Sequence, residues 1–249
     1  MSSIYIKKFL DNHDIKLVHL AKVSSTMSEI KKYIGKKNVC MIVNEQSQGI
    51  GRRGNEWISP KGNIYLSFLF EFNLAIEKHF LYTAVSANSI CTCLNSYINE
   101  NINIKWPNDI NVNNCKIAGI MTEIINFNNL KYAIIGIGIN ISTSPKIINY
   151  KTCCLNDFNL KIKHEEFLLS FLKAFFSEYD MILKKEYNEI INKFKKKMKD
   201  LGNKITILLP NGKKEYVLLK NLNFDGSLQI EKAGKQKSIY SARIIDDFN

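Results

Sequence analysis

The segment QSQGIGRRG (residues 46–54) follows a short apolar run at residues 39–43 and is soon followed by WISPKGNIYLS (residues 57–67). Its three glycines allow the backbone to approach a ligand closely and to expose N–H groups. Arg52 and Arg53 add planar cationic donors that suit phosphate or carboxylate oxygens. The segment matches neither a Walker loop nor a dinucleotide fingerprint. Alone, therefore, it is consistent with a phosphate-binding loop or with a basic surface loop.

Three further motifs place polar groups beside predicted strands. In KWPND (residues 105–109), a proline-stiffened turn presents Asn108, whose amide can read a base edge, and Asp109, whose carboxylate can bind Mg²⁺. KIAGI (residues 116–120) sets Lys116 at the mouth of a strand. GIGIN (residues 136–140) leaves room on one face of a strand that ends in Asn140, and glycine within a strand often marks a close approach. Each motif alone is also explained by a turn or a packed strand.

Hydrophobic periodicity predicts an α+β chain. Strands are expected at residues 15–23, 39–43, 64–72, 102–106, 117–125 and 131–141, and helices at residues 27–34, 76–99 and 164–199. Residues 107–115 are rich in Asn and Asp and predict turns. After Gly202, four short runs at residues 204–209, 215–222, 227–231 and 237–240 predict a small antiparallel β-barrel. We therefore place a domain boundary near Leu201, which gives domains at residues 1–200 and 201–249.

The composition is that of a globular protein without a membrane span. With 45% hydrophobic and 23% charged residues, the 249-residue chain can bury a core and does not resemble a disordered protein. No segment approaches the ~20 apolar residues of a membrane span. The six cysteines form no CxxC pair, so we expect no zinc site and a reducing, cytoplasmic location. The net charge of +12 fits a nucleic-acid surface or scattered solvated lysines, and the scatter favours the second interpretation.

The order and spacing of the motifs resemble biotin–protein ligases from about Ile15 to the C-terminus. The motifs that carry the resemblance are SST (24–26), GIGRRG (49–54), WISPKGNIYLS (57–67), KWPND (105–109), KIAGI (116–120) and GIGIN (136–140). The sequence departs from the family pattern at two positions. Ile50 stands where the family loop, usually GRGRRG, has its first arginine, and Met27 stands where the early motif STN has asparagine. The resemblance implies a mixed β-sheet catalytic domain of the biotin/lipoate ligase type with packed helices, plus an SH3-like C-terminal barrel.

The resemblance also implies a two-step reaction. The biotin carboxylate attacks the α-phosphate of ATP to give biotinyl-5′-AMP and pyrophosphate, and an acceptor lysine then displaces AMP. Arg52 and Lys116 are the expected catalytic residues. The implied biotin-binding residues are Ser25, Thr26, Gln46, Gly51, Arg52, Lys116 and Gly119. The implied ATP-binding residues are Arg52, Arg53, Trp57, Asn108 and Asn140, with Asp109 as the ligand of Mg²⁺.

The expected substrates are biotin and the ATP–Mg²⁺ complex, without a prosthetic group. The expected partner is an acidic biotin carboxyl carrier domain, which a basic ligase would attract electrostatically. A homodimer is an open alternative, and no membrane or DNA contact is expected. Because the first strand begins near Ile15, leaving no room for a winged helix, we expect a monofunctional ligase. A lipoate–protein ligase is the alternative enzyme, although its usual RRxSGG stretch is absent, and a nucleic-acid-binding protein is the alternative from another class.

Overall fold

The structure is a computed structural model that describes residues 4–36, 38–148, 150–160 and 162–245. Its larger part is a mixed seven-stranded sheet with strand order β1-β2-β3-β7-β6-β5-β4, in which only β1 and β2 run parallel. The strands are β1 (Lys16–Val23), β2 (Val39–Gln46), β3 (Ile64–Glu71), β4 (Ile102–Lys105), β5 (Asp109–Val112), β6 (Cys115–Phe127) and β7 (Leu130–Ile139). The helices are α1 (Ile4–Asp11), α2 (Thr26–Glu29), α3 (Phe80–Asn95), α4 (His164–Leu183) and α5 (Tyr187–Lys197). This architecture confirms the predicted α+β class.

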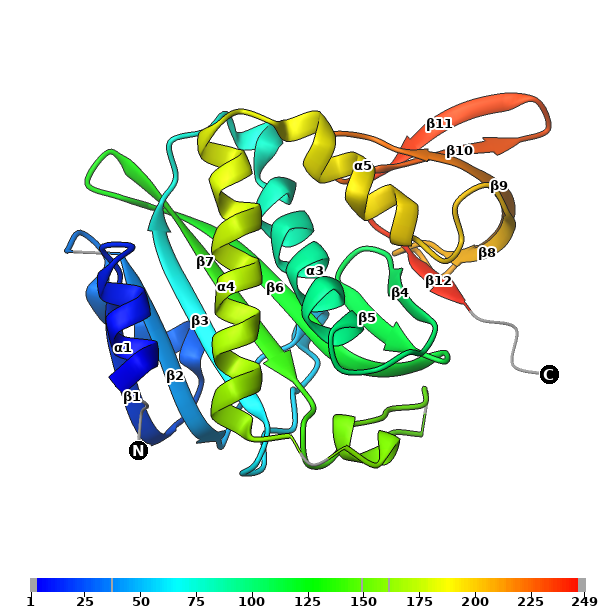
Figure 1. Ribbon diagram of the computed structural model, residues 1–249. Coiled ribbons are helices and arrows are strands. Elements are labelled where there is room, and N and C mark those ends of the chain that lie inside the picture. The colour runs from blue at the N-terminus through cyan, green and yellow to red at the C-terminus, as the bar shows by residue number, and fades with distance from the viewer. Residues whose placement is uncertain (1–3, 37, 149, 161, 246–249) are drawn as a thin grey trace.

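The alternation of side chains along β7 separates the two faces of the sheet. Ala133, Ile135, Ile137 and Ile139 belong to the main hydrophobic core, on the face that α3 and α4 cover (Figure 1). Ile134 belongs to a smaller core on the opposite face, beneath α2. Since successive side chains of a strand point to opposite faces, Gly136 and Gly138 must lie on this second face. At Gly136 and Gly138, therefore, β7 places no side chain on the second face, whereas Ile135, Ile137 and Ile139 fill the first face.

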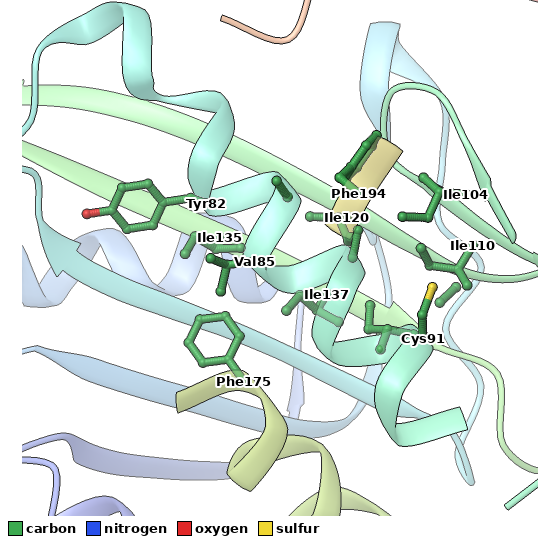
Figure 2. Packing of buried hydrophobic residues seen from close by; sticks show 14 of the residues in the cluster. Tyr82, Val85, Cys91, Ile104, Ile110, Ile120, Ile135, Ile137, Phe175 and Phe194 are labelled. Carbon is green, nitrogen blue, oxygen red and sulfur yellow. The ribbon is translucent and has the colours of Figure 1, made fainter. Parts of the chain in front are cut away.

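The main core is dominated by aromatic and branched side chains between the sheet and α3, α4 and α5 (Figure 2). Phe68 of β3 stacks on Phe175 of α4, with ring centroids 4.3 Å apart and an interplanar angle of 13°. Helix α3 is enclosed by the sheet and both later helices, and nearly all of its side chains are buried. No helix among the described residues is both long enough and apolar enough to cross a membrane.

The single helix predicted at residues 164–199 is wrong, because the chain forms two helices, α4 and α5. Lys185 adopts a left-handed conformation with φ of 61°, which ends α4. The backbone N–H of Glu186 donates to the carbonyl of Met181 (2.8 Å) and satisfies one of the last carbonyls of α4. Hydrophobic spacing continues through the break, so periodicity did not reveal it.

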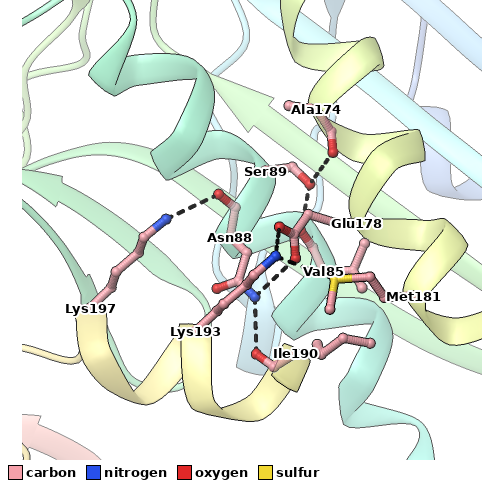
Figure 3. Close-up of polar contacts among 9 residues, drawn as sticks. All are labelled: Val85, Asn88, Ser89, Ala174, Glu178, Met181, Ile190, Lys193 and Lys197. Atoms are coloured by element: carbon pink, nitrogen blue, oxygen red, sulfur yellow. Dashed lines mark hydrogen bonds and ion pairs between the residues drawn. The ribbon is translucent and has the colours of Figure 1, made fainter. Parts of the chain in front are cut away.

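A polar cluster ties the three long helices together inside this core (Figure 3). The side-chain amide of Asn88, fully buried in α3, donates to Glu178 Oε2 (3.4 Å) and to the carbonyl of Ile190 (3.0 Å). Lys193 Nζ of α5 forms an ion pair with Glu178 Oε1 of α4 at 2.8 Å. Since buried polar groups need partners, these contacts fix how α5 docks on α3 and α4.

The C-terminal part is a five-stranded antiparallel sheet with strand order β11-β10-β9-β8-β12. The strands are β8 (Lys204–Leu208), β9 (Lys214–Leu222), β10 (Leu228–Lys232), β11 (Lys235–Ile239) and β12 (Arg243–Ile245). The small antiparallel β domain predicted from the sequence is thus present, and within the described residues its edge strands β11 and β12 do not pair, so the sheet does not close into a barrel.

The C-terminal sheet shares the main core with the larger sheet. Its contacts with the N-terminal part include the hydrogen bond from Trp106 Nε1 to the carbonyl of Gly226 (2.8 Å). A Cβ at Gly226 would lie 2.4 Å from the ring of Phe80, so the chain approaches α3 closely there. The division at residues 200 and 201 stays a prediction.

Three elements lie where the sequence predicted none. Strand β5 occupies part of the stretch predicted as turns, because Asn111 is buried and paired between β4 and β6 despite its turn propensity. Helix α1 precedes the first predicted strand and buries Ile6 and Leu10. Strand β12 pairs with β8 beyond the last predicted strand.

Asn88→Ala tests the polar cluster. The substitution removes the buried donor that the side chain of Asn88 gives to Glu178 and to the carbonyl of Ile190, so we expect the free energy of unfolding to fall by about 1–3 kcal/mol. Asn95→Ala, on the exposed end of the same helix, is the matched control and should change it by less than about 0.5 kcal/mol. Urea unfolding monitored by circular dichroism measures both, and equal losses would show that the cluster does not stabilise the fold.

Candidate active site

A cleft opens on the face of the sheet opposite α3 and α4, where the ends of β2, β6 and β7 meet the loop that follows β2. Its lining residues come from five separate stretches of the chain: Thr26, Met27, Gln46, Ile50, Gly51, Arg52, Trp57, Asn108, Lys116, Gly119, Ile120, Met121, Gly136, Ile137 and Gly138. Eight of the residues predicted for the site are among them: Thr26, Gln46, Gly51, Arg52, Trp57, Asn108, Lys116 and Gly119. The fold thus brings Arg52 and Lys116 into one cleft.

Glycines form the floor of the cleft because two side chains lie directly on the strands. A Cβ at Gly138 would come within 2.4 Å of the Trp57 ring, and a Cβ at Gly119 within 2.9 Å of it. At Gly136 a Cβ would come within 2.5 Å of Met27 Sδ. The close approach predicted for the strand glycines is thus made by the protein's own side chains.

A chain of neutral hydrogen bonds lies at the Gly136 end of the floor. Ser67, paired with Gly136 on β3, donates through its hydroxyl to Thr26 Oγ1 (2.8 Å). Gln46 Oε1 accepts from both the backbone N–H (2.8 Å) and the hydroxyl (3.1 Å) of Thr26. Gln46 Nε2 then donates to Ser59 Oγ (2.9 Å). These groups donate and accept without carrying charge, which suits a neutral polar ligand group.

Ser25 lies immediately before this chain of hydrogen bonds, at the start of α2. Its side chain is buried, yet its hydroxyl has no hydrogen-bond partner in the described part of the protein and does not cap the helix. Because an unpaired buried polar group costs free energy, such a group calls for an explanation. A ligand that bonds to Ser25 would provide one.

Arg52 supplies a cation to the cleft from the loop after β2. Its Nη1 donates to Asn108 Oδ1 (3.0 Å), and Asn108 Nδ2 donates in turn to the carbonyl of Ile120 (2.7 Å). Burial lowers the pKa of the Arg52 guanidinium, and repulsion by Arg53 lowers it further, while Asp109 opposes the shift. A guanidinium remains charged at neutral pH despite such a shift. Arg52 is therefore a partly buried, positioned cation.

Lys116 supplies the second cation from the start of β6. The pairing of β5 with β6 shifts register beside it, between Ile110 and Asn111, and such bulges redirect side chains. Lys116 Nζ lies 2.8 Å from Asp109 Oδ1 and 5.1 Å from the centroid of the Trp57 ring. No carboxylate is among the described residues that line the cleft, so its cationic end suits an anion.

Four predicted site residues lie outside the lining of the cleft. Ser25 and Asn140 are buried beside it; Asn140 Nδ2 donates to the carbonyl of Cys153 (3.1 Å), whereas its Oδ1 has no partner among the described residues. Asp109 reaches the site through its ion pair with Lys116. The guanidinium of Arg53 contacts Ser241 and Ala242 of the C-terminal part instead. The ligand roles of all four stay predictions.

The prediction omitted several residues that line the cleft. Met27 and Ile50 had been identified only as departures from the family pattern, although both line it. Met121 and Gly136 face each other across β6 and β7. The sequence indicated room on one face of the strand at residues 136–140, and the period-two alternation could have assigned Gly136 and Gly138 to the floor.

The cleft encloses a free volume of about 60 Å³. Sites for small molecules usually have about 300–1,000 Å³. The Trp57 ring occupies the space above Gly119 and Gly138, which explains the small volume. A ligand longer than a few atoms must therefore displace the Trp57 ring.

Gly138→Ala tests the packing of Trp57 on the floor. Because the new Cβ would overlap the indole, we expect the free energy of unfolding to fall by about 1–3 kcal/mol. In a Trp57→Ala background the same substitution should cost clearly less, because the overlapping ring is gone. Urea unfolding of the four proteins of this double-mutant cycle provides the measurement, and an equal cost in both backgrounds would contradict the proposed contact.

Comparison with known proteins identifies the relatives of this fold and site. Residues 20–140 match the biotin/lipoate A/B protein ligase family. The biotin–protein ligase 2 of Arabidopsis thaliana is 30% identical over 182 residues, which are 68% of this chain and 52% of the relative. The bifunctional ligase/repressor BirA of Bacillus subtilis is 28% identical over 135 residues, 53% of this chain and 40% of the relative. The chain thus spans about half, or less, of the length of these relatives.

Solved structures agree over most of the chain. The biotin protein ligase from Aquifex aeolicus in complex with biotin and ATP superposes with a TM-score of 0.77 at 26% identity, covering 92% of this chain and 97% of that one. The fold therefore has the biotin/lipoate ligase arrangement predicted from the sequence. The family match spans all the motifs from the loop after β2 to the end of β7. The chain therefore has the fold of a biotin protein ligase, and its residues 20–140 match the biotin/lipoate A/B protein ligase family.

Proposed function

We propose that the protein is a biotin–protein ligase, which activates biotin as biotinyl-5′-AMP and transfers it to a lysine of a biotin carboxyl carrier domain. The observation that carries this proposal is the convergence of Arg52 and Lys116 on one cleft. The family match and the likeness to a ligase that binds biotin and ATP support the same assignment.

The order of groups along β7 supports the proposed orientation of biotin. The neutral hydrogen-bonding groups Thr26 and Gln46 lie near Gly136, whereas Lys116 and Trp57 lie near Gly138. Two residues of a strand span about 6.6 Å. A ligand with a neutral polar ring at one end and a carboxylate at the other matches this sequence of groups. The ureido ring would bond to Ser25, Thr26 and Gln46, and the carboxylate would face Arg52 and Lys116.

In the first step, a biotin carboxylate oxygen forms a bond to the α-phosphorus of ATP, and the bond from that phosphorus to the bridging oxygen breaks as pyrophosphate leaves. Two anions must approach each other for this reaction. Arg52 and Lys116 offset their repulsion and stabilise the charge that develops on the phosphoryl oxygens. The pairing of Arg52 with Asn108 and of Lys116 with Asp109 positions both cations before the substrates bind.

In the second step, the amine of the acceptor lysine attacks the acyl carbon of the mixed anhydride. A C–N bond forms, the C–O bond to AMP breaks, and the amine loses a proton. Trp57 and the unpaired Oδ1 of Asn140 are the proposed neighbours of the adenine. By covering the cleft, the loop that carries Arg52 would keep water away from the reactive anhydride.

Mg²⁺ would enter with ATP and supply further neutralisation of the phosphates. The described residues contain no cluster of three or more His, Cys, Asp or Glu side chains that could hold a metal by itself. One carboxylate together with substrate phosphates is a common environment for Mg²⁺. Asp109, beside Lys116, fits this arrangement and is the proposed ligand.

The direct test combines the purified protein with biotin, ATP–Mg²⁺ and a carrier domain, followed by intact-mass spectrometry of the carrier. We expect the mass to increase by one biotinyl group only when ATP is present. A parallel pyrophosphate-exchange assay with biotin or lipoate separates the two ligase activities of the family. Exchange with lipoate but not with biotin would overturn the proposal, as would the absence of exchange with either.

Arg52→Gly tests the role of the loop in retaining the intermediate. Losing a charge-assisted hydrogen bond of about 1.5–3 kcal/mol should accelerate release of biotinyl-5′-AMP at least about tenfold. The released adenylate should then biotinylate lysines of a bystander protein such as albumin, which blotting with streptavidin detects. Lys61→Gly, which removes an exposed cation from the same segment, is the control. Retention of the adenylate equal to wild type in Arg52→Gly would refute this role.

A further inference from the structure

Two adjacent arginines of the loop at residues 49–57 point to different parts of the molecule. Arg52 lines the cleft and bonds to Asn108, just before β5. Arg53 is not among the lining residues, and its Nη2 donates to Ser241 Oγ (2.9 Å) and to the carbonyl of Ala242 (2.9 Å). Those two residues connect β11 to β12 in the C-terminal sheet. The loop therefore bridges the large sheet and the C-terminal sheet.

The backbone of Arg53 explains how neighbouring side chains diverge. Arg53 is left-handed, with φ of 57° and ψ of 36°, and Gly54 follows with φ of 75°. Glycine adopts this region readily, whereas an arginine there costs free energy. Most of the other non-glycine residues with positive φ in this chain are Asn or Asp, which tolerate that region better. The contacts of the Arg53 side chain offset the cost of its conformation.

The acceptor of the Arg53 hydrogen bond is held in a fixed position. Ala242 is buried in the main core, so the core fixes the position of its carbonyl. The base of the loop is closed by hydrogen bonds from the N–H of Trp57 to the carbonyl of Gly49 (2.8 Å) and from the N–H of Gly51 to the carbonyl of Asn55 (2.7 Å). Those bonds lie within the loop, whereas the Arg53 contact joins its tip to a distant part of the chain.

We propose that Arg53 is a positioning residue that fastens the loop to the segment between β11 and β12, so that Arg52 is presented to the cleft and the C-terminal sheet contributes to retention of the adenylate. The inference rests on the proposed function, because the intermediate is the ligand retained. It assigns Arg53 to the loop itself, in place of the direct contact with ATP expected from the sequence.

Exchanging the charges at positions 53 and 241 distinguishes a positioning role of Arg53 from a direct contact with ATP. Arg53→Glu alone breaks the contact with Ser241, so we expect release of biotinyl-5′-AMP to accelerate about tenfold. Arg53→Glu combined with Ser241→Arg rebuilds an ion pair of reversed polarity and should bring release to within about threefold of wild type. A direct contact with phosphate cannot be rebuilt in this way, because a carboxylate at position 53 repels the nucleotide. If the double variant releases the adenylate as fast as Arg53→Glu, the positioning role is wrong.

Two further measurements exclude a general loss of structure. The melting temperature of each variant should stay within about 2 °C of wild type, since the substituted side chains of Arg53 and Ser241 are exposed. Arg243→Ala removes a neighbouring exposed cation and is the matched control, with release expected to equal that of wild type. A large rise in the KM for ATP in Arg53→Ala, with release unchanged in Ser241→Ala, would identify Arg53 as a nucleotide contact and overturn the proposal.

Hydrogen–deuterium exchange in the ligand-free protein tests the contact independently of ligase activity. Ser241→Ala removes one of the two acceptors, so amides of residues 49–57 should exchange about two- to threefold faster, whereas Arg243→Ala should leave them unchanged. If wild type forms no adenylate but Ser241→Ala accelerates exchange, the proposed function fails and the contact stands. If exchange is unchanged in Ser241→Ala, the contact does not hold the loop, whatever the activity.

Discussion

The close packing of the Trp57 ring on the backbone of β7 is the contact on which the arrangement of the site depends. Only glycine at position 138 leaves room for the ring, and the same ring covers Gly119 on the neighbouring strand. Trp57 ends the loop that carries Arg52 and also lies beside Lys116. Arg52 of the loop and Lys116 of β6 therefore line one cleft, above the part of the sheet where glycines leave the backbone without side chains. A β-sheet with side chains at these positions would have no cleft there.

The cleft also illustrates how like charges are held together. Arg52 and Lys116 are like charges that line one cleft, and partial burial disfavours the charged form of Arg52. Asn108 accepts a hydrogen bond from Arg52, and Asp109 pairs with Lys116, so two consecutive residues of one turn offset much of that cost. An anionic substrate can offset the remainder. Binding of a carboxylate and a phosphate is favoured because it offsets this remaining cost.

Sequence reasoning predicted most of the strands and the motifs of the site, because alternation and glycine placement are local signals. It did not predict the break at Lys185, since hydrophobic spacing continues across it. Strand β5 was missed because Asn and Asp favour turns, yet pairing on both sides overrides that propensity. The direction of the Arg53 side chain depends on a left-handed backbone and on an acceptor 188 residues away, and no local pattern encodes either.

The central claim is that Arg52 and Lys116 act together on the atoms where a carboxylate meets a phosphate. A crystal structure of the protein with a stable sulfamoyl analogue of biotinyl-5′-AMP tests it most directly. The account predicts that the guanidinium of Arg52 and the ammonium of Lys116 both lie within about 3.5 Å of oxygens of the acyl–sulfamoyl linkage. A structure in which either cation faces away from that linkage, with the analogue bound elsewhere, would contradict the account.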